Sequence, residues 1–244
     1  MNRDELRTRG PERPPAHRTS NGVTWIGPID SDAGGTWIGT NEFGVTACLL
    51  NAYFPIGAAP EAIQSGAKSR GVIIPELLAH RSYRECASWL NESLDPTQFA
   101  GFMLLLVAAD SCAHFLWRGH GELQHHAHDE EWTCLTSSFI DSTDAEKWRY
   151  SGFRSWVEQG APSKSGLPLY HLQRDAGKES LSPLMDRDYS VTRSITSIDV
   201  DPAHTRVRYW SAPTPNTDPA HPTTELSLPL IAADTARPNC ADAG

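Results

Sequence analysis

The pattern of apolar and polar residues in the first half of the chain predicts strands before helices. Residues 36–39 and 44–51 alternate or run apolar with β-branched residues, and residues 41–44 between them have turn-forming character. This arrangement predicts a β-hairpin. Residues 103–109 form a continuous apolar run of strand length, which predicts a strand buried on both faces.

Helical spacing replaces this pattern in two places. Over residues 69–91, Ile73, Leu77 and Leu78 share one face, as do Tyr83, Cys86, Ala87 and Leu90. This spacing predicts either two short helices or one bent helix. Residues 143–157 predict an amphipathic helix whose first turns contain acidic residues that complement the helix dipole.

Further strands are predicted at residues 113–117 and 132–138. Residues 190–200 and 205–210 predict a second hairpin around an Asp-Pro turn. The resulting order is hairpin, helices, strands, helix and hairpin. It indicates an α+β fold with antiparallel sheets.

Two segments have no such pattern. Residues 5–22 are rich in Arg, Pro and Gly, which excludes a helix or a central strand and predicts an ordered loop or arm. After Ser211 the chain is rich in Pro, Thr, Asp and Ala, so residues 211–244 are expected to be a mostly disordered tail in which only residues 226–231 dock. The globular domain is therefore predicted at residues 1–210.

Composition narrows the function classes. The 244 residues have a net charge of −9, and no Lys/Arg-dense segment lies beyond the first eighteen residues, which argues against a nucleic-acid partner. The longest apolar run, residues 102–109, is too short to span a membrane, and no secretory signal is visible. Five cysteines without CxxC spacing indicate reduced thiols in a cytoplasmic protein.

Several short motifs occur in a characteristic order. They are Asn2-Arg3-Asp4-Glu5, Gly34-Gly35-Thr36-Trp37-Ile38-Gly39, Leu49-Leu50-Asn51, Ser69-Arg70-Gly71, Leu135-Thr136-Ser137-Ser138 and Thr192-Arg193-Ser194. Together they resemble the NRDE family, also called the transport and Golgi organisation protein 2 family, over roughly residues 2–210. The first two motifs, followed by Ser69-Arg70-Gly71 at the family's distance, are the most specific part of the match.

The resemblance implies more than the pattern does. The family resembles N-terminal-nucleophile hydrolases, whose fold is a four-layer αββα sandwich. In the related bile-salt and penicillin amidases an N-terminal cysteine is the nucleophile, and its own α-amino group acts as the base. An Asn-x-Asp element on the neighbouring strand holds both groups, and Asn2-Arg3-Asp4 corresponds to that element.

The sequence departs from the family at two points. The family's first strand, with Met-Cys near its start, is expected to be missing, because the NRDE motif begins at residue 2 and the first cysteine is Cys48. Hydrolysis by the family's route is therefore not expected from the sequence as it stands. Ser137 also occupies a position at which many relatives have Asn, and a hydroxyl is a shorter donor toward an oxyanion than an amide.

The resemblance implies the following site. Asp4 and Arg3 would orient the nucleophile, Asn51 and Ser137 would lie near the oxyanion, and Asn2, Gly34, Gly35 and Arg193 would contact the substrate. A simpler interpretation of Gly34 and Gly35 is a turn or bulge that needs positive φ, with Trp37 packed in the core.

Two other site types are weaker. His114, His120, His125, His126 and His128 invite a metal site, but a polar hairpin tip is the preferred interpretation, and neither a metal nor a cofactor is predicted. A Ser137, His171 and Asp188 triad has no supporting nucleophile motif. The predicted function is a cysteine-type amidohydrolase of linear amides in a form that has the N-terminal cysteine. The alternative is a non-catalytic carrier of haem or an acyl-CoA lipid.

Overall fold

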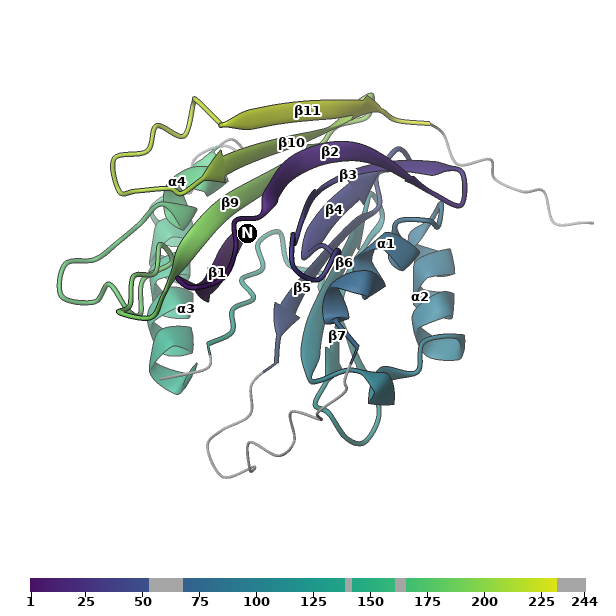
Figure 1. Cartoon of the computed structure of the whole chain (residues 1–244), viewed down its shortest axis with the longest axis horizontal. Coiled ribbons are helices and arrows are strands. Elements are labelled where there is room, and N and C mark those ends of the chain that lie inside the picture. The colour runs from purple at the N-terminus through teal and green to yellow at the C-terminus, as the bar shows by residue number, and fades with distance from the viewer. Residues whose placement is uncertain (53–67, 139–141, 161–165, 232–244) are drawn as a thin grey trace, which may run out of the picture.

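The computed structural model describes residues 1–52, 68–138, 142–160 and 166–231. Its strands form two antiparallel sheets, one of four strands in the order β1-β9-β10-β11 and one of seven strands in the order β2 to β8. Helices α1 and α2 cover the seven-stranded sheet, and α3 and α4 lie on the far side of the four-stranded sheet (Figure 1). The α+β class and the four-layer αββα order are thereby confirmed.

The four-stranded sheet consists of β1 (Asn2–Leu6), β9 (Ser190–Val200), β10 (His204–Ser211) and β11 (Thr224–Pro229). The seven-stranded sheet consists of β2 (Arg13–Ser20), β3 (Val23–Ile29), β4 (Ile38–Asn41), β5 (Thr46–Asn51), β6 (Phe102–Ala108), β7 (Ser111–Trp117) and β8 (Gln124–Ala127). The hairpins predicted around residues 41–44 and 201–204 are both present.

The helices are α1 (Ile73–Leu77), α2 (Tyr83–Glu92), α3 (Ser142–Glu158) and α4 (Leu167–His171), with short 3-10 turns at Arg70–Val72 and Pro96–Gln98. Residues 69–91 therefore form two helices and not one bent helix. Ser82 ends the gap between them, because its hydroxyl accepts a hydrogen bond from the Glu85 backbone N–H and caps α2.

Each interface between layers has its own apolar cluster. The largest lies between α1, α2 and the seven-stranded sheet, where Leu104, Leu106 and Phe115 are fully buried. Between the sheets, Trp37, Ile38 and Cys48 pack against Tyr209, and Ile26 packs against Val207 and Leu228. A fourth cluster joins Leu172 and Leu184 to Ile195 and Trp210 of the four-stranded sheet.

The prediction of a loop over residues 5–22 is wrong for residues 13–20, which form β2. The strand accommodates Pro14 and Pro15 because it is at the edge of its sheet, and its pairing with β3 is irregular between Arg13 and Ala16. Proline lacks a backbone N–H, so it is tolerated at a sheet edge or a bulge but not in a central strand.

The strand predicted at residues 132–138 is also wrong. This segment has no regular secondary structure and runs between β8 and α3. At the other end of the chain, Leu226 and Leu228 of β11 pack on the cluster of Ile26 and Val207. Regular structure therefore extends beyond residue 210, and residues 232–244 lie outside the described residues.

Candidate active site on strand β1

Strand β1 carries the NRDE motif, and it pairs with β9 along one side. Its other side forms an edge of the four-stranded sheet as far as the described residues show. Successive side chains of a strand point to opposite faces. Arg3 accordingly points toward the seven-stranded sheet, whereas Asn2 and Asp4 point toward the layer of α3 and α4, as their contacts below show.

Arg3 is buried within a network of charges between the sheets. Its guanidinium lies 3.4 Å from Glu12 and 3.5 Å from both Glu5 and Asp30. It also lies over the Trp37 ring, 4.4 Å from the centroid. Arg3 is thus paired with carboxylates of the protein itself, among them Glu5 of the same motif.

The same network contains Arg193 and the buried Glu12, whose side chain is 4% exposed. Arg193 Nε lies 3.8 Å from Glu12 Oε2, and the Tyr209 hydroxyl donates a 3.0 Å hydrogen bond to Glu12 Oε1. Arg193 is therefore linked to Arg3 and not to Asp4. Glu12 was missed by sequence reasoning because it lies in the segment predicted to be a loop.

Asp4 has different neighbours. Thr192 Oγ1 donates a 2.6 Å hydrogen bond to Asp4 Oδ1, and an Nη of Arg149 lies 3.4 Å from Asp4 Oδ2. The Asp4 side chain keeps 25% of its exposure. A carboxylate held by two donors and still partly open to solvent retains lone pairs that can accept a further hydrogen bond.

Asn2 lies on the same face of the strand. Its Nδ2 donates hydrogen bonds to the carbonyl oxygens of His171 and Pro183 at 3.0 and 2.5 Å. Its Oδ1 is buried and accepts no hydrogen bond from the part of the chain that the structure describes. An unpaired buried acceptor costs about 1–3 kcal/mol, so this position favours an N–H or O–H donor from a bound group.

Arg149 of α3 connects Asp4 to the segment after β8. Besides Asp4 it donates hydrogen bonds to Thr136 Oγ1 at 3.1 Å, to the Ser137 carbonyl at 3.4 Å and to the Leu181 carbonyl at 3.0 Å. It thus brings Ser137 and Asp4 to one guanidinium. Sequence reasoning missed Arg149, because an arginine in an amphipathic helix is normally solvated; only its i, i+4 spacing between the buried Ala145 and Phe153 could have indicated burial.

Gly34 and Gly35 have backbone roles in the structure. Gly34 has a φ of +72°, and its N–H bonds to the Asp30 carbonyl in a turn. A Cβ on Gly35 would lie 2.5 Å from the Gly71 carbonyl carbon, so the two backbones are in direct contact. These observations agree with the turn interpretation. Asn51 ends β5, next to residues that lie outside the described ranges.

The histidine run forms a contact cluster. His114 and His126 are opposite each other in the pairing of β7 and β8, their rings stack at 4.6 Å, and His114 Nδ1 lies 2.8 Å from His128 Nε2. Desolvation, with the neighbouring imidazoles, lowers the pKa of His114 to about 4. No group of three or more His, Cys, Asp and Glu within the described ranges has a geometry that could hold a metal ion.

The thiols of the described residues are not activated. Burial raises the pKa of Cys48 and of Cys134 to about 11 and that of Cys86 to about 12, and it raises the pKa of Cys112 as well. A thiol with a raised pKa stays protonated near neutral pH and is a poor nucleophile. Cys240 lies outside the described residues. Desolvation also lowers the pKa of His171 well below its usual value.

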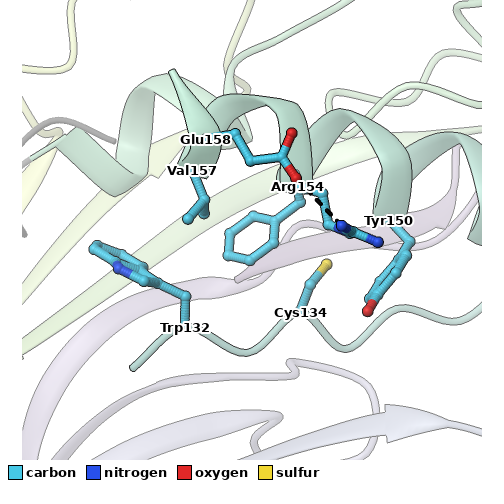
Figure 2. Close-up of a pocket in the computed structure, with 7 residues that line it drawn as sticks. Trp132, Cys134, Tyr150, Arg154, Val157 and Glu158 are labelled. Carbon is cyan, nitrogen blue, oxygen red and sulfur yellow. Dashed lines mark hydrogen bonds and ion pairs between the residues drawn. The ribbon is translucent and has the colours of Figure 1, made fainter. Parts of the chain in front are cut away.

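A hollow of about 130 Å³ lies between α3 and the segment 132–138 (Figure 2). It is lined by Trp132, Cys134, Tyr150, Phe153, Arg154, Val157 and Glu158. Arg149 is near enough for its charge to act against the rise in the Cys134 pKa, although burial dominates. The hollow and the Asp4 site therefore share both α3 and the segment 132–138.

The family model described as Transport and Golgi organisation 2 matches residues 1–207. No curated protein matches the chain. Among solved structures, a penicillin V acylase from Agrobacterium tumefaciens is similar, with 17% identity and a TM-score of 0.45 over 84% of this chain and 75% of that one. No helix in the described ranges is long and apolar enough to cross a membrane.

Proposed function

The chain belongs to the Transport and Golgi organisation 2 family, and we propose that it carries the orienting part of a cysteine-type amidohydrolase site. In this proposal Asn2 and Asp4 hold the nucleophile of an enzyme that cleaves linear amide C–N bonds. Ser137 and Asn51 lie on the side where negative charge develops on the carbonyl oxygen.

The observation that supports the proposal is the pair of acceptors on one face of β1. The unpaired Asn2 Oδ1 and the partly exposed Asp4 carboxylate are two residues apart in the chain, and the pairing of β1 with β9 shifts between Arg3 and Asp4. A primary amine has two or three N–H donors and can be oriented by acceptors placed in this way. An amine held next to a thiol can accept the thiol proton.

In this proposal the described thiols do not supply the nucleophile, because burial raises their pKa values. The side chains bonded to Asp4 are those of Thr192 and Arg149, and neither is a cysteine. We therefore propose that the nucleophile is an N-terminal cysteine encoded upstream of Met1. Arg3 contributes indirectly, since its charge is taken up by Glu5, Glu12 and Asp30 and it fixes β1 against the second sheet.

The test begins with the gene. Translating the in-frame DNA upstream of Met1 should give a strand-like segment with Met-Cys near its start. The extended chain should hydrolyse small linear amides, and replacing that cysteine by Ala should abolish hydrolysis while leaving the circular dichroism spectrum unchanged. An upstream sequence without such a segment, or equal turnover by the Cys→Ala variant, would overturn the proposal.

The same preparations examine the carrier alternative. If the extended chain does not hydrolyse amides, it should be titrated with haem while the Soret band is followed, and separately with an acyl-CoA by calorimetry. Saturable binding of either compound together with absent turnover would replace the hydrolase proposal with that of a non-catalytic carrier.

A further inference from the structure

The hollow beside α3 is lined mainly by apolar side chains. Trp132, Phe153 and Val157 line it, and the Cys134 sulfur points toward α3 on the side of Tyr150 and Arg154 (Figure 2). Arg154 and Glu158 lie at its rim, where they pair with each other at 3.2 Å and are each 64% exposed. Their charges are thus neutralised and solvated, and a buried ligand would meet carbon and sulfur.

The aromatic rings around the hollow form a packed group. Trp132 and Trp156 are perpendicular at 5.8 Å, and Phe153 contacts Tyr170 edge-on at 5.3 Å. Tyr170 in turn donates a hydrogen bond to the backbone carbonyl of Arg149. Edge-to-face packing of this kind is the favoured geometry for aromatic pairs, so the ring group can accept a further ring in the same way.

The hollow is close to Asp4 along both α3 and the facing segment. Phe153 follows Arg149 by four residues on the buried stripe of α3, which places their Cβ atoms about 6 Å apart. Cys134 precedes Thr136 by two residues on the facing segment, and Thr136 is bonded to Arg149. The hollow is therefore about one helical turn from the guanidinium that contacts Asp4.

We propose that this hollow is the subsite that selects the substrate, and that it takes a single aromatic ring attached near the scissile amide. The hollow is partly open to solvent, and its volume of about 130 Å³ is close to the ~150 Å³ of an enclosed apolar cavity that takes one benzene ring. A short aliphatic group would fill it poorly, and a long chain would not fit. The proposal rests on the proposed function for its chemistry, but ring binding itself needs no catalysis.

A second hollow on α3 provides the matched control. It has a volume of about 260 Å³ and is lined by Asp144, Lys147, Trp148, Ser151, Lys178 and Leu181. Three of these residues are charged, and the Trp148 indole is already bonded to Asp175 at 2.8 Å. A phenyl group introduced here adds the same bulk to the same helix without filling the hollow at Phe153.

The experiment measures binding of phenylacetamide and butyramide to the 244-residue chain by ligand-observed NMR. Burying a phenyl ring is expected to make phenylacetamide bind roughly tenfold more tightly than butyramide. Cys134→Phe fills the hollow and should remove this preference. Ser151→Phe should leave both dissociation constants within about twofold of their original values. If Cys134→Phe does not fold, Cys134→Leu is used in its place and should reduce the preference.

Equal binding of the two amides, or an equal effect of the Cys134 and Ser151 variants, would overturn the subsite. The outcome is separate from that of the proposed function. Hydrolysis by the extended chain without a ring preference would reject only the subsite, whereas ring binding without hydrolysis would reject only the hydrolase.

Discussion

The two faces of β1 differ in how completely their charges are paired. On the face of Arg3, the guanidinium meets three carboxylates and an indole ring, and its side chain is 8% exposed. On the face of Asp4, the carboxylate meets one hydroxyl and one guanidinium and is 25% exposed. Neighbouring residues of one motif therefore have different surroundings: Arg3 joins the two sheets, and Asp4 is the residue that we propose for the site.

The comparison predicts a ranking of variants by their cost in free energy of unfolding, with Arg3 first. Arg3→Met leaves Glu12 buried without its closest cation, and breaking a buried ion pair in this way costs about 3–5 kcal/mol. Urea unfolding followed by Trp fluorescence measures the loss. The double variant Arg3→Met with Glu12→Gln is the control and should recover part of it. A loss within about 0.5 kcal/mol would place Arg3 among ordinary surface residues.

Gly35 should come next, because it supports the segment that ends in Trp37 below Arg3. Gly35→Ala places a Cβ within 2.5 Å of the Gly71 backbone, and such overpacking costs about 1–3 kcal/mol. Gly34→Ala meets open space but keeps a positive φ, so about 1 kcal/mol is expected. Thermal unfolding of the pair checks the order. The contact interpretation would be contradicted if Gly34→Ala were the more destabilising of the two.

Arg149 should have an intermediate and localised effect. Arg149→Gln removes charged hydrogen bonds to Asp4 and Thr136. A hydrogen bond to a charged group contributes about 1.5–3 kcal/mol. Hydrogen exchange should become faster in residues 132–138 and stay unchanged in β6 and β7. Arg154→Gln, on the exposed side of the same helix, is the control. Uniformly faster exchange would show that Arg149 supports the whole fold and not this segment.

A pH effect of smaller size is expected at the other end of the seven-stranded sheet. The pKa of His114 is about 4 in the fold and near 6.5 in an unfolded chain. The unfolded state therefore binds more protons between these values, and stability should fall as the pH is lowered from about 6.5 to 4. His114→Gln should flatten this part of the stability curve. An unchanged slope would exclude His114 as its source.

The alternation of residues was sufficient to predict the α+β class, both hairpins and the helices of residues 69–91 and 143–157. It was not sufficient for β2. Pro14 and Pro15 exclude a central strand but not an edge strand, and the sequence does not show that β2 is at the edge of its sheet. Residues 132–138 are strand-like in composition but pair with no strand among the described residues, so local propensity did not determine their conformation.

The candidate site was predictable only in part. The motif directed attention to Asn2, Asp4 and Ser137, and Arg149 brings Asp4 and Ser137 together. Arg193 and Arg3 share the other face, and Glu12 completes their network. Arg149 and Glu12 were not found because a buried charge is recognised by its partners, which are distant in the sequence.

The most direct test of the account compares Asp4→Asn with Arg3→Lys in the extended chain, with amide hydrolysis and urea unfolding measured on the same samples. Asp4→Asn should lower kcat/KM per folded molecule by roughly a hundredfold or more, while the loss of its charged contact with Arg149 costs about 1.5–3 kcal/mol of unfolding free energy. Arg3→Lys should show marked destabilisation and a rate per folded molecule that is nearly unchanged. If Asp4→Asn hydrolyses amides at the original rate, or loses activity only in proportion to its unfolded fraction, the division between the two faces of β1 is contradicted.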